Sequence, residues 1–491
     1  MAYQLSSDIN REKTFIVNKS EIEGRLDSEF YKPSIALLEN KIRSLSTKKL
    51  RAYVLAFAGG ATPSKKESGK YYSDSPNGIP FLRVQNLQTT GELLLDGCLY
   101  INDETHNGLL KRSQVSEGDL LIKITGVGRM AIASVAPKGF VGNTNQHMVV
   151  VKTGNIEISK YLAHYFNLDI VEKIASRHST GGTRPALDYP SLKNIPIIEG
   201  LDFSFIDDAI KTKKEKETEA QQLLESIDNY LLNELGIILP ESKKSLSHRI
   251  FLLSYRQVIG KRIDPKKYSI SVRELYDSIL NSPYEKTSLK NLITNVSSGD
   301  WGDECENTEI PKGFVKCLVL RATEFDNQYN LNIDSRKVKY RLLKQASYDK
   351  IKISENDIII EKSGGSEDLP VGRVAILDKH VMALDTNIAF SNFLAKITVR
   401  NVNPIYLYYF LKMVYHIGIT EVMQSQTNGI RNLIMAEFLS QQIVLPSSVK
   451  QQEIVEHITA IQQKAKALQE EGKRILENAK HEVERMIMTK E

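Results

Sequence analysis

The sequence of 491 residues is long enough for two to four domains, each with its own core. Its composition, with 41% hydrophobic and 25% charged residues, excludes a largely disordered chain, and no apolar run approaches the roughly eighteen residues that a membrane helix needs. The net charge of +5 is weak evidence for a polyanionic partner, and the three scattered cysteines fit neither a disulfide framework nor a zinc site. We expect a protein of a reducing cytoplasm.

Ordered segments of the first half recur in the second half, and this internal repeat organises the chain. A short motif at residues 26–31 recurs at 263–268, and a strand-like run at 118–123 recurs at 356–361. Across all the matches the offset drifts only from 237 to 247 residues, too little for chance. We therefore predict two tandem copies of one unit.

Each copy continues with an aromatic-rich helical pattern, a polar glycine turn that contains an arginine, and a short apolar strand. In the first copy these elements are expected at 161–166, 179–184 and 195–198. In the second copy they are expected at 406–411, 426–431 and 443–446.

A long amphipathic helix closes each copy. Apolar residues repeat at spacings of three and four from Phe203 to Leu231, and again from Ile454 to Ala479, as in a coiled-coil seam. We expect the first helix to end at Gly236. The two helices are predicted to pair with each other within the chain. The alternative is two unrelated amphipathic helices that each pack on their own domain.

Three interruptions of the seams, at Lys213, Glu217 and Gly472, would weaken a zipper of two identical helices, which favours pairing within one chain. The expected fold class is α+β, with two tandem mixed α/β domains joined by two long helices in an antiparallel intramolecular coiled coil. The expected segments are 1–198 (first domain), 199–240 (first long helix), 241–446 (second domain with a basic N-terminal segment) and 447–491 (second long helix).

Two stretches, 243–273 and 336–352, are rich in lysine and arginine and poor in acids. Clusters of this kind can neutralise phosphates and release counterions from nucleic acid. The alternative is a solvated basic face.

Two similar units on an antiparallel helix pair would have the symmetry of a dimeric DNA reader within one polypeptide. A helix of roughly 35 residues is about 50 Å long, and this length corresponds to about one and a half turns of duplex DNA. Because the two copies differ in sequence, we expect a bipartite and asymmetric DNA target with an unread spacer.

Polar side chains on turns are the candidate DNA contacts, because arginine can bind guanine, and asparagine or glutamine can bind adenine, with two hydrogen bonds. The alternative for each is a turn-capping or surface role. In the first copy the candidates are Arg83, Gln85, Asn86, Lys123, Thr125, Arg129, Asn145, Gln146, Gly181, Gly182 and Arg184. In the second copy they are Arg321, Thr323, Lys362, Ser363, Arg373, Asn387, Asn428 and Arg431.

Motifs of catalysis are absent from the sequence. It has no adenine-methyltransferase motif, nucleotide-binding Walker loop, metalloprotease motif or nuclease pattern, and the glycines at 126 and 128 fit a hairpin turn better than a nucleotide loop. We expect no catalytic residue, no metal site and no cofactor in this chain.

The chain resembles the specificity (S) subunit of type I restriction-modification enzymes over most of its length. The residues that carry the resemblance are Thr180–Leu187 with Leu192–Ile197, the helix entry at Leu445, Pro446 and Gln451–Ile454, and the openings Leu26–Tyr31 and Gly59–Ser64. The entry to the first helix, Glu199–Asp202, departs from the family pattern, and the second copy has one glycine in its turn where the first has two.

The resemblance implies two target-recognition domains, each reading one half of a split double-stranded DNA site in a prokaryotic cytoplasm. It also implies docking of two methyltransferase (M) subunits, which would hold S-adenosylmethionine, and of endonuclease (R) subunits for restriction and phage defence. Two alternatives remain open: a stand-alone DNA-binding regulator or phage-defence adaptor on the same scaffold, and a coiled-coil scaffold with no DNA role.

Overall fold

The computed structural model describes residues 6, 8–74, 77–241, 250–260, 263–305, 309–325, 331, 333, 339–366, 369–427 and 430–490. The chain forms two compact units: a first unit of Met1–Glu217 with Gln469–Glu491, and a second unit of Thr218–Leu468. Both long helices therefore contribute to both units. Within the described ranges, no helix is long and apolar enough to cross a membrane.

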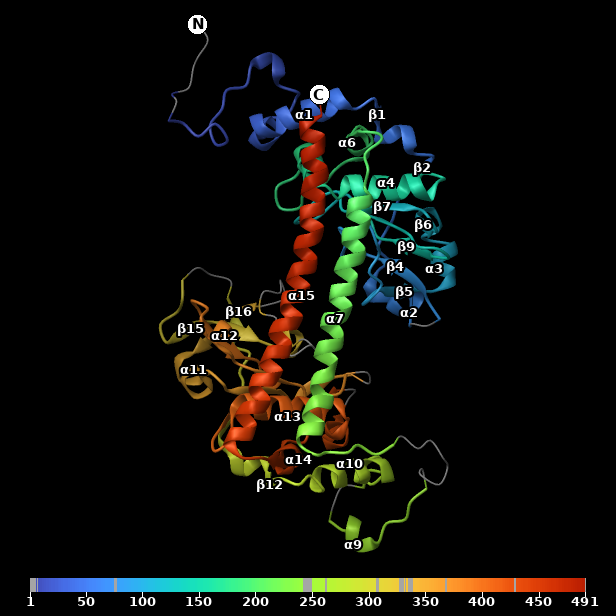
Figure 1. Ribbon diagram of the computed structural model, residues 1–491. Helices are drawn as coiled ribbons and strands as arrows, with labels where there is room; N and C mark the ends of the chain where they lie inside the picture. Colours follow the sequence, from blue (N-terminus) through green and yellow to red (C-terminus); the bar gives the residue numbers. More distant parts are fainter. Residues whose placement is uncertain are drawn as a thin grey trace. The chain divides into compact units, whose positions relative to one another are not determined.

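The first unit contains two sheets and a two-stranded ribbon (Figure 1). The first sheet is antiparallel, in the order β2 (Ala56–Gly59), β10 (Met148–Lys152), β7 (Leu120–Lys123) and β8 (Ala133–Val135). The second has the order β3 (Tyr72–Ser73), β5 (Leu99–Ile101), β4 (Ile79–Leu82), β9 (Val141–Thr144) and β6 (Gln114–Ser116), and only β4 and β9 are parallel. β1 (Lys48–Lys49) and β11 (Pro196–Ile197) form the ribbon. The helices are α1 (Pro33–Leu45), α2 (Ser68–Tyr71), α3 (Asp103–Asn107), α4 (Ile156–Phe166), α5 (Asp169–His178) and α6 (Tyr189–Lys193).

The second unit repeats this strand order. Its first sheet is β13 (Ile293–Ser298), β21 (Leu394–Val399), β17 (Ile358–Glu361) and β19 (Val374–Ile376). Its second is β14 (Asp303–Glu304), β16 (Lys339–Lys344), β15 (Phe314–Leu320) and β20 (Asn387–Phe390), in which β15 and β20 are again parallel. β12 (Glu285–Ser288) pairs with β24 (Gln442–Leu445) as β1 does with β11. The predicted repeat is confirmed by this topology.

Further elements of the second unit surround these sheets. A three-stranded sheet has the order β18 (Ser363–Gly365), β23 (Ile430–Leu433) and β22 (Gln424–Thr427). The helices are α9 (Tyr255–Val258), α10 (Ile270–Leu280), α11 (Gln345–Ile351), α12 (Lys379–Met382), α13 (Pro404–His416) and α14 (Met435–Ser440). α4 and α13 lie where the aromatic-rich patterns predicted helices.

The first three residues of each central strand, β7 and β17, are apolar because both faces of the first sheet are covered. In β7, Leu120 and Ile122 belong to the core on the side of α4, while Leu121 belongs to the core below the second sheet. In β17, Ile358 and Ile360 likewise belong to one core and Ile359 belongs to the other. A strand that alternates between two cores has no polar face.

The long helices α7 (Ser204–Glu234) and α15 (Ser448–Thr489) lie side by side in each unit (Figure 1). In the second unit Glu219 pairs with Lys464 at 3.4 Å and Glu234 with Lys450 at 2.5 Å, so the helices are antiparallel. Of the predicted seam residues, Leu224, Ile227, Leu231, Ile454, Ile458 and Ala465 are buried in the second unit, and Ile206 and Ile210 in the first. In the first unit α15 buries Leu476, Val483 and Ile487, whereas the predicted Ile475 and Ala479 are only partly buried. The predicted pairing is confirmed, and the alternative of separate helices is wrong.

The interruptions of the seam fit each other in the first unit. A Cβ atom on Gly472 would lie 3.3 Å from both Cα and Cγ of Lys213, so the glycine makes room for the lysine. The Lys213 ammonium then donates to Glu217 at 2.6 Å. α7 ends at Glu234, and Gly236 follows with a left-handed φ of +61°, as predicted for the helix stop.

Glu39 on α1 is a buried carboxylate that ties α1 to α5 in the first unit. Its oxygens accept hydrogen bonds from Arg177 at 2.6 Å and His178 at 2.9 Å, and from Arg43 of its own helix at 2.9 Å. Burial raises the pKa of a carboxyl, but here the hydrogen bonds and charges of His178 and Arg43 outweigh burial and lower the pKa of Glu39 to about 2.

We expect Glu39→Gln to destabilise the first unit by about 2–3 kcal/mol at pH 7, because the amide leaves the cations without their carboxylate. Since the folded-state pKa is depressed, this stabilisation is complete above pH 4.5 and is lost as the pH falls toward 2. Urea unfolding of both proteins at pH 7, 5, 4 and 3 measures it. Glu29→Gln, at a side chain that is 71% exposed, is the control. An equal difference in stability at pH 7 and pH 3 would contradict this account.

Candidate nucleic-acid interface

The same arginine turn occurs in both units at the end of a central strand of the second sheet. Arg83 follows β4 and Arg321 follows β15, and each precedes a single 3-10 turn. The backbone N–H of Arg83 donates to the side chain of Asn86 at 2.8 Å, and that of Arg321 to Glu324 at 2.6 Å. The third residue of each turn therefore fixes the backbone of the arginine.

The two arginine side chains have different neighbours. Arg83 donates to the carbonyl of Gly97 at 3.0 Å. Arg321 donates to Glu324 at 3.0 Å, and its guanidinium lies 5.8 Å from the ring centre of Trp301. Gln85 and Thr323 are both exposed on these turns, and Thr323 donates to Glu324 at 2.8 Å.

The last residues of β7 and β17 carry opposite charges in equivalent buried positions. The Lys123 ammonium, 3% exposed, donates to the carbonyls of Val127 and Arg129 at 2.9 and 2.8 Å and so closes the β7–β8 hairpin. Glu361, 2% exposed, accepts two hydrogen bonds from Arg373 at 2.8 and 3.0 Å. Each hairpin thus supplies hydrogen-bond partners for its own buried charge, carbonyl oxygens for Lys123 and a guanidinium for Glu361.

Three of the candidate DNA contacts lie in the interior, and we withdraw them. Asn86, Lys123 and Asn145 are between 1% and 6% exposed. Asn86 also donates to the carbonyl of Leu94 at 2.7 Å, and Asn145 accepts from the backbone N–H of His147 at 3.1 Å. Their polar atoms hold turns together and are buried, so they are not available to contact a base.

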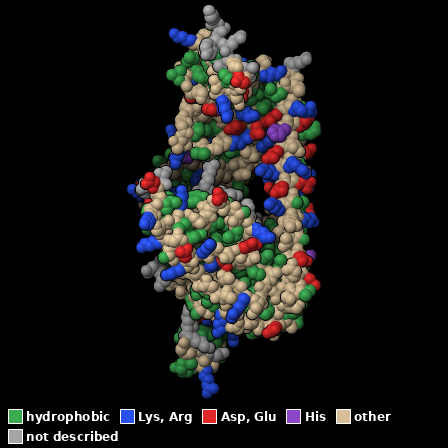
Figure 2. All heavy atoms as spheres, turned by 90° about the vertical axis from the view of Figure 1, so that its left-hand side faces the viewer, with side chains coloured by type: hydrophobic (Ala, Val, Ile, Leu, Met, Phe, Trp, Pro, Cys, Tyr) green, Lys and Arg blue, Asp and Glu red, His purple; other side chains and the backbone are tan. Residues whose placement is uncertain are grey.

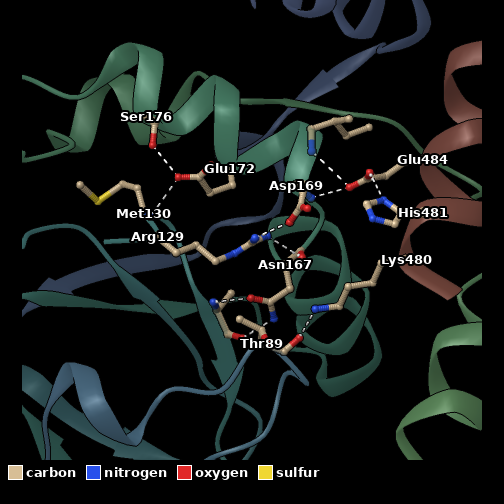
Figure 3. Close-up of polar contacts among 12 residues, drawn as sticks. Thr89, Arg129, Met130, Asn167, Asp169, Glu172, Ser176, Lys480, His481 and Glu484 are labelled. Carbon is tan, nitrogen blue, oxygen red and sulfur yellow. Dashed lines mark hydrogen bonds and ion pairs between the residues drawn. The ribbon is translucent and has the colours of Figure 1, made fainter. Parts of the chain in front are cut away.

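Arg129 points toward α5 in the first unit. It pairs with Asp169 and donates to the carbonyl of Asn167 at 2.7 Å (Figure 3). Lys480 of α15 donates to the carbonyl of Thr89 at 2.7 Å in the same view. Arg129 therefore positions the N-terminus of α5 rather than projecting freely, whereas Gln146, which bonds to Thr62, is exposed.

The polar glycine turn of the first unit is described in full, whereas that of the second unit is described only on either side of residues 428–429. In the first unit Thr180 and Thr125 each form a β-bridge with Ala186, and Gly181, Gly182 and Arg184 are exposed between the bridged residues. In the second unit β22 and β23 form the hairpin and β18 pairs with β23, which brings Ser363 beside Arg431 and Asn432. Asn428 lies outside the described residues.

A hollow of about 500 Å³ opens in the second unit between these elements. Its walls include four of the candidates: Arg321, Thr323, Ser363 and Arg373. The two arginine side chains are 26% and 16% exposed, while their carboxylate partners are 0% and 3% exposed. Glu324 therefore lies behind the Arg321 guanidinium, whereas Glu361 lines the hollow together with its partner Arg373.

The remaining candidates of the second unit lie around this hollow or away from it. Lys362 precedes Ser363, and its ammonium donates to the hydroxyl of Ser298. Asn387 lies at the opposite end of β20 from the hollow, where it donates to the carbonyl of Lys316 at 3.4 Å. The structure thus brings Arg321, Thr323, Ser363 and Arg373 together around the hollow. Asn387 lies away from it.

Sequence reasoning missed Trp301, Asn392 and Phe393, which also line the hollow. Trp301 follows the turn at Gly299, the counterpart of Gly60, and Asn392 and Phe393 occupy the turn that corresponds to Asn145–His147. Because these turns occupy equivalent places in the two copies, a comparison of the copies position by position could have found these residues.

The two basic stretches are partly neutralised. Lys267 pairs with Glu437 at 2.8 Å, and Arg341 with Glu304 at 3.4 Å. Figure 2 shows basic and acidic side chains interspersed over the face that it presents. Residues 243–249, 261–262 and 336–338 of these stretches lie outside the described residues. In the described ranges, no group of three or more His, Cys, Asp or Glu side chains could hold a metal ion.

The family model described as "Type I restriction modification DNA specificity domain" matches residues 54–198 and 308–478, more than half of the chain. A search of curated proteins found no significant match. Among solved structures, the chain is similar to an HsdS subunit from Thermoanaerobacter tengcongensis (12% identity, TM-score 0.31, covering 89% of this chain and 94% of that chain). It is also similar to a type I S subunit from M. genitalium (12%, 0.32, 89% and 95%) and to the type IIG restriction endonuclease BpuSI (13%, 0.29, 36% and 28%).

Proposed function

The chain belongs to the type I restriction-modification DNA specificity domain family, and we propose that it is the non-catalytic subunit that directs a methyltransferase complex to a bipartite, asymmetric DNA site. The observation that carries this proposal is the duplication of one reader fold within the chain, with the arginine turn, the hairpin tip and the sheet order repeated. Two readers in one polypeptide fit a site of two parts.

The asymmetry of the site is supported by differences at equivalent positions. The third residue of the arginine turn is Asn86 in one unit and Glu324 in the other, and Lys123 is replaced by Glu361. The hollow around Trp301 is a feature of the second unit. Because the walls differ in charge and shape, the two half-sites should differ in base sequence.

The proposed partners are duplex DNA, two methyltransferase subunits that bind S-adenosylmethionine, and endonuclease subunits. Deletion of the gene is expected to abolish one adenine-methylation motif across the genome, and the protein should copurify with an adenine methyltransferase. An unchanged methylome, or a stand-alone protein that binds DNA without that partner, would favour a regulator instead.

Substitution of an exposed candidate DNA contact should affect only the half of the methylation motif that its own unit reads. We expect Arg184→Ala in the first unit and Thr323→Ala in the second to relax methylation at one position each, in opposite halves, since a lost base contact costs about 1–3 kcal/mol. Sequencing the methylated sites of each strain measures this effect. Thr212→Ala, at a half-buried threonine of α7 whose hydroxyl donates to the carbonyl of Asp208 at 2.9 Å, is the control. If both variants relaxed the same half of the methylation motif, the proposal that each unit reads its own half-site would be contradicted.

The helix pair is proposed to set the spacer length. Residues 218–224 of α7 and 461–467 of α15 face each other in the second unit, where Glu219 pairs with Lys464. Removing both segments takes about 10 Å from each helix. The recognised spacer should then shorten by about three base pairs, at 3.4 Å each. Methylome sequencing reads the spacer directly, and an unchanged spacer would contradict the proposal.

A further inference from the structure

An exposed phenylalanine stands at the rim of the hollow in the second unit. Phe393 is 47% exposed, whereas the next residue, Leu394, is fully buried in β21. It is the last residue of the three-residue turn that joins β20 to β21, after the polar Ser391 and Asn392. An aromatic side chain that faces water in a polar surrounding gains free energy when a ligand covers it.

The backbone holds this phenylalanine in place. Its carbonyl accepts from the backbone N–H groups of Lys362 and Ser363 at 2.9 and 3.2 Å. On the other side of the turn, Ser391 donates its N–H to Leu320 at 2.8 Å, and its carbonyl accepts from Leu394 at 2.9 Å. The ring therefore projects from a fixed turn, which is a suitable arrangement for reading a rigid partner.

The surroundings of Phe393 fit a partner that carries polar hydrogen-bonding groups, negative charge and an apolar group. Arg321 and Arg373 line the hollow with Glu361, which is paired with Arg373, and Lys362 adds a further cation beside the turn. The Ser391 hydroxyl, in a residue only 1% exposed, has no hydrogen-bond partner in the described part of the chain. Duplex DNA offers phosphates for the cations, polar base edges for the donors, and one apolar group in its major groove, the 5-methyl of thymine.

We propose that Phe393 recognises a thymine of the second half-site through its 5-methyl group. This inference rests on the proposed function, because it assumes that the second unit reads DNA. Phe393 would distinguish thymine from cytosine at one position, because the methyl group would pack on its ring at the edge of the hollow that Trp301 lines.

The first unit supplies an internal comparison. Its corresponding turn joins β9 to β10 and ends in His147, which is half-buried. An imidazole at this position offers hydrogen bonds in place of an apolar face. Recognition through the methyl group is therefore expected in one half-site and not in the other.

The test uses the purified methyltransferase complex and oligonucleotides of its own methylated sequence, in which each thymine is replaced in turn by uracil. Uracil keeps the pairing and lacks only the methyl group. For one thymine, in the half-site that Thr323→Ala alters, uracil should weaken binding by about three- to tenfold. Phe393→Ala should bind the two oligonucleotides equally, Phe393→Leu should keep part of the preference, and His147→Ala should keep all of it.

Several outcomes would overturn the inference: no thymine in that half-site, no effect of uracil, or an unchanged preference in Phe393→Ala with the wild-type unfolding temperature. If Phe393→Ala lost the methyltransferase partner and kept DNA binding, the ring would be a protein-docking residue instead. Failure of the proposed function is distinct, because the wild-type complex would then show no sequence-specific binding to any of the oligonucleotides.

Discussion

Gly60→Ala and Gly299→Ala are each expected to destabilise their own unit by about 3 kcal/mol or more. A Cβ atom at Gly60 would lie 1.9 Å from the carbonyl oxygen of Thr144, and one at Gly299 would lie 2.2 Å from that of Phe390. These carbonyls belong to β9 and β20, the equivalent strands of the second sheets. Since backbone atoms inside a sheet cannot yield as a side chain can, the strands must separate.

The measurement is hydrogen exchange of the full chain, which resolves the two units by peptide. Gly60→Ala should speed exchange in residues 54–198 and Gly299→Ala in residues 285–445. Gly69→Ala is the matched control, because a Cβ there meets no atom within 4 Å. Normal protection in either glycine variant would mean that the close approach between the sheets is not required.

Removal of residues 469–491 is expected to unfold the first unit and leave the second folded. The segment supplies Leu476, Val483 and Ile487, between 0% and 5% exposed, to the core of the first unit. It also supplies the Glu484 carboxylate, which accepts from the backbone N–H groups of Asp169 and Ile170 at 2.5 and 3.2 Å (Figure 3). Each buried apolar side chain contributes roughly 1.5–3 kcal/mol, so the loss should exceed about 5 kcal/mol.

A finer version of this experiment uses single residues of the same helix. Val483→Ala and Ile487→Ala should lower the stability of the first unit by about 1–4 kcal/mol each. Met486→Ala and Met488→Ala, at side chains 43% and 44% exposed, should change it little. Limited proteolysis with mass spectrometry identifies which unit is cut. Equal sensitivity of both units to the truncation would contradict the division of the chain into these two units.

The repeat, the helix pair and the helix stop at Gly236 could be predicted because their signals are local. Spacings of three and four, a glycine after the last seam residue, and segments that recur at a near-constant offset need no knowledge of the tertiary structure. The four-segment division of the chain stays a prediction. The structure shows instead that Leu476 and Val483 complete the first unit, which is a long-range contact that no local pattern encodes.

The candidate site was harder to predict, because burial decides which polar residue can reach a ligand. Asn86, Lys123 and Asn145 lie at or near strand ends, as exposed turn residues do, yet they are buried. The reverse holds for Phe393, an apolar residue that the turn after β20 exposes and that no motif in the sequence marks as a contact residue.

The composition of the first unit also fixes the order in which the units can be completed during synthesis. Residues 469–491 leave the ribosome after residues 218–468. The second unit therefore has its full set of residues while the first, although translated earlier, still lacks one wall of its core. Domains usually fold from the N-terminus onward. Here the core of the first unit, which contains Ile206 and Ile210, is complete only after residues 469–491 have been synthesised.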